Sequence, residues 1–120
     1  MAEYKQYITQ VLENGNVMIS EDVIAAIIAQ TVAEIDGIDG LAVKPVAEFA
    51  DLIGKNWGKG MKIMINEDNS VDIDCNVLIK FGQSVIDVAT AAQQAITSAV
   101  ENSASVKVNF VNVNVCGIVR

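Results

Sequence analysis

Histidine is absent from this sequence of 120 residues, and both proline and aromatic residues are scarce. Without histidine, the chain lacks the side chain that most often serves as a general base near neutral pH and most often binds transition metals. Aromatic residues make up only 5% of the chain, so the core is expected to be aliphatic, built from Val, Ile and Ala. The composition therefore disfavours histidine-dependent catalysis and predicts no metal and no other cofactor.

Cysteine is also rare, with only Cys75 and Cys116 present, each inside a strand-like run. No C-x-x-C pattern and no histidine is present to activate either thiol. Because free cysteine is among the most buried residue types, two buried thiols are the simplest interpretation. A disulfide or one reactive thiol is the alternative.

Long apolar runs are missing as well: the longest, Val23 to Ala29, has seven residues, whereas a bilayer-spanning helix needs about 20. The amino terminus lacks the apolar stretch of a signal peptide. Fifteen acidic against eight basic residues give a net charge of −7, which on average repels nucleic acid and anionic lipid. We therefore expect a cytoplasmic protein without direct membrane insertion or nucleic-acid binding, although a local basic patch remains compatible with this average.

The spacing of apolar residues predicts one α+β domain over residues 1–120. Residues 1–14 form an amino-terminal extension that is a candidate strand, and Asn14-Gly15 signals a hairpin turn. The elements expected after it are a strand over 16–20, a helix from Ser20 to about 36, a short helix over 45–53, strands over 61–65 and 71–81, a helix over 85–101 and a strand over 106–118. This order favours a two-layer sandwich: a mostly antiparallel sheet with two main helices on one face, plus the short helix.

The last predicted strand, "VKVNFVNVNVCGI", changes its pattern in the middle. Two sets of apolar residues occupy opposite parities, Val106, Val108 and Phe110 in the first half and Val111, Val113 and Val115 in the second. A bulge near Phe110-Val111 would return all six to the core; alternatively, the strand leaves its sheet. High β-propensity, little charge and no proline make Val111, Val113 and Val115 candidate self-assembly residues.

The stretch "VAEIDGIDGL" concentrates acids and glycines after the first helix. It does not match a calcium loop, because Ile38 falls at a required oxygen-ligand position. As a G-x-x-G loop between helices, "GIDG" resembles the phosphate clamp of a KH domain, but Asp36 and Asp39 would repel phosphate. We interpret the stretch as a helix stop, with Gly37 in a left-handed conformation and Ile38 folded back on the helix.

A second segment, "GKNWGKGMK", gathers lysines and the single tryptophan in an acidic protein. Lys55, Trp57, Lys59 and Lys62 are therefore candidate partner-docking residues, with the tryptophan as anchor. The alternative is that Trp57 covers the short helix and the lysines form a solvated turn.

Taken together in order, the segments resemble the alkaline shock protein 23 family, also called the envelope stress response protein family. The resemblance runs from Gly15 to Val119 and is carried by "GNVMISEDVIAAIIAQTVAEIDGI", "LIGKNWGKGMKI", "VDIDCNVLIKFG", "SVIDVATAAQQAI" and "VNFVNVNVCGI". It departs at Lys44-Pro45, where relatives often have a glycine-rich turn. The resemblance implies a cytoplasmic protein of Gram-positive-type bacteria, without known catalytic activity, linked to envelope homeostasis and stress. Some members are held at the membrane by a membrane-protein partner, and some self-associate.

Three hypotheses about function follow. The first is a non-catalytic scaffold that forms a homo-oligomer or filament and binds a membrane-anchored protein partner. The second is a KH-like nucleic-acid-binding module, which would need a basic face begun by lysines such as Lys55, Lys59 and Lys62. The third is a small enzyme using Asp72 and Asp74, although alternation along a strand predicts that both carboxylates face solvent.

Overall fold

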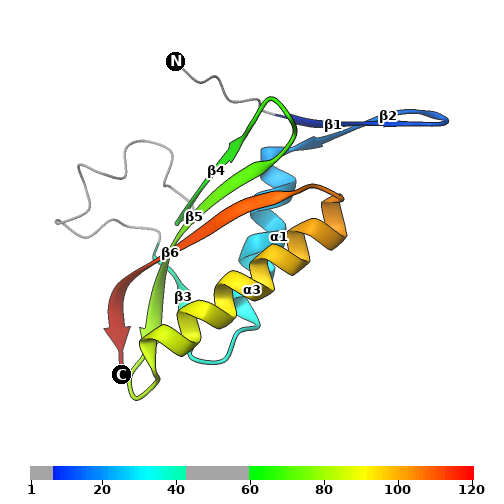
Figure 1. Cartoon of the computed structure of the whole chain (residues 1–120). Helices are drawn as coiled ribbons and strands as arrows, with labels where there is room; N and C mark the ends of the chain where they lie inside the picture. The colour runs from blue at the N-terminus through cyan, green and yellow to red at the C-terminus, as the bar shows by residue number, and fades with distance from the viewer. Residues whose placement is uncertain (1–6, 43–59) are drawn as a thin grey trace.

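The structure is a computed structural model that describes residues 7–42 and 60–120 (Figure 1). Its elements are β1 (Tyr7–Leu12), β2 (Gly15–Ser20), α1 (Glu21–Ala33), β3 (Ile38–Leu41), β4 (Met61–Ile65), β5 (Val71–Lys80), α3 (Val85–Ala104) and β6 (Val108–Val119). The short helix predicted over 45–53 lies outside the described residues, as do Lys55, Trp57 and Lys59.

Strand β5 is the centre of the main sheet. Strand β6 runs parallel to it along its whole length, whereas β4 pairs antiparallel with Val71–Cys75 and β3 pairs antiparallel with Val77–Ile79. A strand has only two edges, so β3 and β4 lie end to end on the edge opposite β6. Helices α1 and α3 cover one face of this sheet, which confirms the predicted two-layer α+β sandwich (Figure 1).

Three of the four strand pairings are antiparallel, as predicted, but the β5–β6 pair is parallel. Helix α3 provides the crossover connection that a parallel pair requires.

Where β3 meets β4, the two backbone groups of Asn76 in β5 hold both neighbouring strand ends. The Ala42 amide donates to the Asn76 carbonyl at 2.8 Å, and the Asn76 amide donates to the Gly60 carbonyl at 2.8 Å. One residue of β5 therefore holds both Ala42, which follows β3, and Gly60, which precedes β4.

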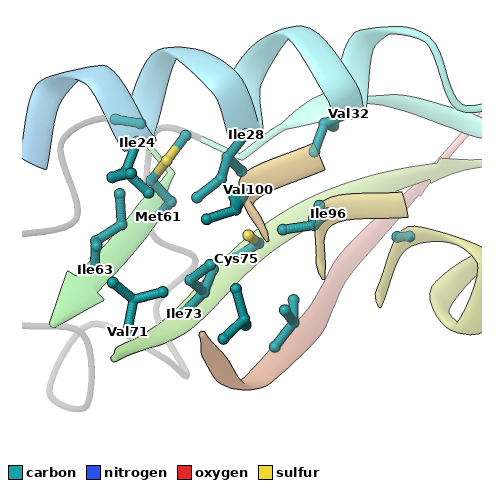
Figure 2. Close-up of a cluster of buried hydrophobic side chains, with 14 of the residues drawn as sticks. Ile24, Ile28, Val32, Met61, Ile63, Val71, Ile73, Cys75, Ile96 and Val100 are labelled. Carbon is teal, nitrogen blue, oxygen red and sulfur yellow. The ribbon is translucent and has the colours of Figure 1, made fainter. Parts of the chain in front are cut away.

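The core lies between the helices and the sheet (Figure 2). Alternate residues of β5 point into it, and α3 contributes residues at four-residue spacing, as the sequence patterns predicted. Fully buried members include Ile24 and Ile28 of α1, Val71, Ile73, Cys75, Val77 and Ile79 of β5, and Ala92, Ile96 and Val100 of α3. The two main helices and the long central strand are thus fixed by ordinary hydrophobic burial.

Three apolar residues at the ends of β5, α1 and α3 that were expected in the core are exposed instead. Phe81 is 63% exposed because β5 ends at Lys80, so the alternation that would have turned this ring inward stops one residue earlier. Val23 and Val85 stand in the first turns of α1 and α3 and are also exposed, because the helix stripes that contact the sheet begin at Ile24 and Val88.

The amino-terminal extension contains β1, which forms an antiparallel hairpin with β2. Leu12 pairs with Gly15, so the two turn residues are Glu13 and Asn14, one position earlier than predicted. Gly15 takes a φ of 137°, which glycine adopts readily. The hairpin is a separate two-stranded sheet that projects from the body of the molecule (Figure 1).

Helix α1 ends at Ala33, three residues before the predicted end, while Gly37 has the predicted left-handed conformation, with a φ of 94°. Ile38 is buried, as predicted, but it also begins β3, which was not predicted. Because Ile38, Gly40 and Leu41 pair with β5, most of "GIDG" is a strand rather than a loop between helices. The KH-like alternative loses the loop on which it depended.

Strand β6 contains two register shifts. Asn109 is an extra residue opposite the Val71-Asp72 step, and Cys116 is an extra residue opposite the Val77-Leu78 step. The first shift confirms a bulge close to the predicted Phe110-Val111 position. It returns the valines to the core side but not Phe110, which lies opposite Asp72 and is 42% exposed. The prediction that all six apolar residues lie on the core side was therefore right for the five valines and wrong for Phe110.

Candidate functional site

Within residues 7–42 and 60–120, no group of three His, Cys, Asp or Glu side chains converges to hold a metal ion. In that part of the chain, neither helix has the length and apolar character needed to cross a membrane. Both thiols are free; Cys75 is buried, and burial raises its pKa to about 12. Cys116 is only half-buried, against expectation, and burial also raises its pKa.

Asp72 and Asp74, the carboxylates considered for an enzyme, are tied to β6. The Asn109 amide nitrogen donates to Asp72 at 3.0 Å, and the Asn112 amide nitrogen donates to Asp74 at 2.8 Å. These side chains form cross-strand rungs on the sheet face opposite the helices. Such pairs stabilise neighbouring strands, so their evident role is structural.

A third rung is more deeply placed. Asn76 is 2% exposed, and its side-chain oxygen accepts a hydrogen bond from the Asn114 amide nitrogen at 3.0 Å. A buried polar side chain is costly without a partner. The Asn76–Asn114 bond therefore helps to specify the register of β6 against β5.

The outer edge of β6 is the first interaction surface. Among the described strands, β6 pairs only with β5, so its other edge has no strand beside it. The Gln93 side chain of α3 donates to the Val111 carbonyl at 3.0 Å, which shows that this carbonyl points away from β5. Because alternate residues direct their backbone groups to opposite edges, Val113 and Val115 present theirs to the same outer edge.

The predicted self-assembly residues thus combine two roles. Their side chains face the helical layer, where Val111 is buried and Val113 and Val115 are half-buried against the core. Their backbone groups form the open edge between the two bulges. Bulges limit edge pairing with other chains, so the stretch available for pairing is the regular one between Phe110 and Val115.

The tip of the β1–β2 hairpin is the second surface, and the sequence patterns did not indicate it. Val11 is 80% exposed and Met18 61%, on one face of the ribbon, while Leu12 and Val17 are exposed on the other. The hairpin is anchored through buried Ile8 and through two hydrogen bonds, from the Gln10 side chain to the Ser105 carbonyl at 3.1 Å and from the Asn69 side chain to the Thr9 carbonyl at 3.1 Å. The sequence did carry a signal for this surface: apolar residues occur on both faces of the predicted hairpin. A two-stranded ribbon can bury only one face against the core, so the other apolar residues had to be exposed.

The third surface lies at the far end of the molecule, where β5 turns into α3. Phe81, Ile86 and Ile118 are at least half exposed there. Next to them, Lys80 and Arg120 line a shallow hollow of about 430 Å³, and the Arg120 guanidinium lies 4.9 Å from the centre of the Phe81 ring. This end therefore combines exposed apolar side chains with two cations.

Of the predicted docking residues, only Lys62 lies in a described segment. It is half-buried in β4 and pairs in register with Asp74 of β5. Lys62 is thus part of the main sheet, while Lys55, Trp57 and Lys59 lie outside the described residues.

Comparison with known proteins defines the class of protein. A family model described as the alkaline shock protein 23 family, with a cell envelope-related function, matches residues 9–120. The chain therefore belongs to the alkaline shock protein 23 family.

Two relatives illustrate the relationship. The uncharacterized protein YqhY of Bacillus subtilis is 30% identical over 105 residues, covering 87% of this chain and 77% of the relative. The uncharacterized protein Spy1535 of Streptococcus pyogenes is 33% identical over 106 residues, covering 88% of this chain and 80% of the relative. No solved structure gives a significant match.

Proposed function

We propose that this protein is a non-catalytic, cofactor-free cytoplasmic scaffold that serves cell-envelope stress homeostasis. It acts by assembling with itself and by binding a membrane-anchored protein partner. Membership in a family with a cell envelope-related function supports the setting.

The observation that carries the self-assembly is the outer edge of β6. Val111, Val113 and Val115 form a strand edge that no other described strand pairs with, in a segment of high β-propensity without charge. Exposed strand edges are templates for pairing with a second chain. Gln93 occupies only the Val111 carbonyl, at one end of this edge.

The net charge of −7 supports a protein partner rather than lipid as the membrane contact. The inner surface of a bacterial membrane is anionic, so an acidic protein is repelled from it on average. A membrane protein with a complementary surface overcomes this repulsion by specific contacts.

Val113→Pro tests the edge-pairing mechanism. Proline removes the backbone N–H that faces outward, whereas the hydrogen bonds between β6 and β5 use the neighbouring residues. Val113→Thr is the matched control, because threonine keeps the N–H, the approximate volume and the β-propensity. Light scattering across a wide concentration range should show association for the wild type and Val113→Thr, and monomer for Val113→Pro with helical circular dichroism unchanged. A wild type that stays monomeric throughout overturns the proposal.

The partner is tested with membranes from the protein's own cell, stripped of peripheral proteins. The protein should sediment with these membranes and lose this binding when they are treated with protease beforehand. Binding that survives the protease treatment contradicts a protein partner.

A further inference from the structure

We propose that the hairpin tip of one copy binds the hollow at the opposite end of the next, so that copies join head to tail. The hairpin tip means Val11, Leu12, Glu13, Val17 and Met18; the receiving end means Lys80, Phe81, Ile86, Ile118 and Arg120. This contact rests on the proposed self-assembly but is separate from the β6 edge.

The hairpin tip has the character of an unsatisfied binding element. Leu12 and Val17 continue the ribbon face whose base, Ile8 and Ile19, packs against the core, yet they extend past it and are 56% and 44% exposed. The Gln10 side chain donates to the Ser105 carbonyl at 3.1 Å and supports the ribbon as far as its middle, whereas a two-stranded ribbon beyond such support is marginally stable in water. Covering its apolar tip would stabilise the ribbon and remove apolar surface from water.

The receiving end offers exposed apolar side chains around a hollow, as a contact with the apolar tip requires. Its hollow of about 430 Å³ is bordered by Phe81 and Ile118, which are 63% and 50% exposed. That volume falls in the range typical of pockets that take small ligands or anchoring side chains. Ile86, 73% exposed in the first turn of α3, extends the apolar surface beyond the hollow.

Charge also matches across the proposed contact. Glu13 is one of the two turn residues at the hairpin tip, whereas Lys80 and Arg120 line the hollow. These cations stand out in a protein with fifteen acidic and eight basic residues. Asp87 follows Ile86 in the first turn of α3 and lies outside the hollow-lining set. Opposite charges at a contact rim set register and exclude wrong orientations.

The positions of the two surfaces make the contact one between different copies. They lie at opposite ends of a molecule whose longest dimension is 50 Å (Figure 1). A tip therefore cannot reach the hollow of its own chain. A contact between two different surfaces that does not close on itself generates an open chain of copies.

An anionic bilayer is the competing occupant of the receiving end. Two cations beside exposed Phe81 and Ile86 are compatible with a lipid surface, but each contributes little at physiological salt. The remaining charge of the molecule opposes approach to such a surface. The lipid alternative also leaves the apolar hairpin tip without an occupant, whereas a second copy accounts for both surfaces at once.

A charge-swap experiment tests the contact. The tip variant is Glu13→Lys, and the end variant carries Lys80→Glu and Arg120→Glu together. Each alone places like charges across the contact and should weaken association at least about tenfold in sedimentation velocity. An equimolar mixture of the two variants restores opposite charges at every contact and should recover wild-type association. Glu67→Lys, in the exposed β4–β5 turn, makes the same change of charge outside both surfaces and should leave association unchanged.

The outcomes separate the two contacts between copies. If Glu13→Lys and Leu12→Asp associate as the wild type does, the head-to-tail contact is wrong, whatever Val113→Pro shows. If they dissociate the protein while Val113→Pro does not, the head-to-tail contact stands and the β6 edge fails. Sedimentation with vesicles of anionic phospholipid, lost in the end variant but kept in Glu13→Lys, would overturn the proposal in favour of lipid.

Discussion

Gly37→Ala should destabilise the fold by two separable effects. Gly37 has a φ of 94°, and a Cβ atom placed there would lie 2.8 Å from Val88 Cγ2 and 3.3 Å from Gln83 Cγ. The left-handed conformation costs alanine about 1–2 kcal/mol, and an overpacked contact typically adds about 1–3 kcal/mol. The free energy of unfolding should fall by about 2–5 kcal/mol, which lowers the melting temperature by on the order of 10 °C in a domain of this size.

Gly82→Ala isolates the first effect. Gly82 has a φ of 93°, nearly the same as Gly37, but a Cβ atom at this position would meet no atom within 4 Å. This variant should therefore cost only about 1–2 kcal/mol. In a Val88→Ala background, Gly37→Ala should also cost about that much, because the clashing methyl group is gone. Urea unfolding measures these differences for Gly37→Ala, Gly82→Ala, Val88→Ala and the double variant of Gly37→Ala with Val88→Ala, at concentrations where the protein is monomeric. Equal losses for Gly37→Ala and Gly82→Ala would refute the assigned role of Val88.

Two further predictions concern buried groups. Asn114→Ala should lower the free energy of unfolding by about 1–3 kcal/mol, because it leaves the Asn76 side-chain oxygen, in a residue 2% exposed, without its donor; a change within experimental error in urea unfolding would contradict this. The raised pKa of Cys75, about 12, means that the folded chain keeps this proton after the unfolded chain, with a pKa near 9, has released it. The contribution of this thiol is therefore fully present below about pH 9 and is lost as the pH rises toward 12. Comparing the pH dependence of melting in the wild type and Cys75→Ala checks this, and equal slopes above pH 9 would contradict it.

The sequence predicted the elements whose burial follows a strict period. In β5, Val71 to Ile79 alternates between core and outer face, and in α3 the buried residues recur every four positions. These patterns arise because one face of each element is removed from water. One sequence is therefore enough to predict these elements. The same reasoning placed the two helices in one layer over the sheet.

Such patterns do not predict which strands pair with each other. Strand β3 is only Ile38–Leu41, and its Asp39 and Gly40 have low strand propensity. It forms because β5 offers a free edge beyond the end of β4. The parallel pairing of β6 likewise depends on where α3 returns the chain. Tertiary context decided both.

The interaction surfaces were predictable only in part. High β-propensity identified the valines of β6 as candidate self-assembly residues. The direction of their backbone groups follows only from the Gln93–Val111 hydrogen bond in the structure. The hairpin tip was missed because exposure of Val11 and Met18 depends on how far the ribbon extends beyond the core. The pattern of apolar and polar residues does not give the distance by which the hairpin extends beyond the core.

The position of Asn76 bears on how sequences of this family can diverge. Its backbone amide and carbonyl hold Gly60 and Ala42, and every residue type except proline supplies both of these groups. Relatives can therefore exchange the Asn76 side chain together with its Asn114 partner without losing these two backbone bonds, whereas proline at position 76 would leave the Gly60 carbonyl without its donor.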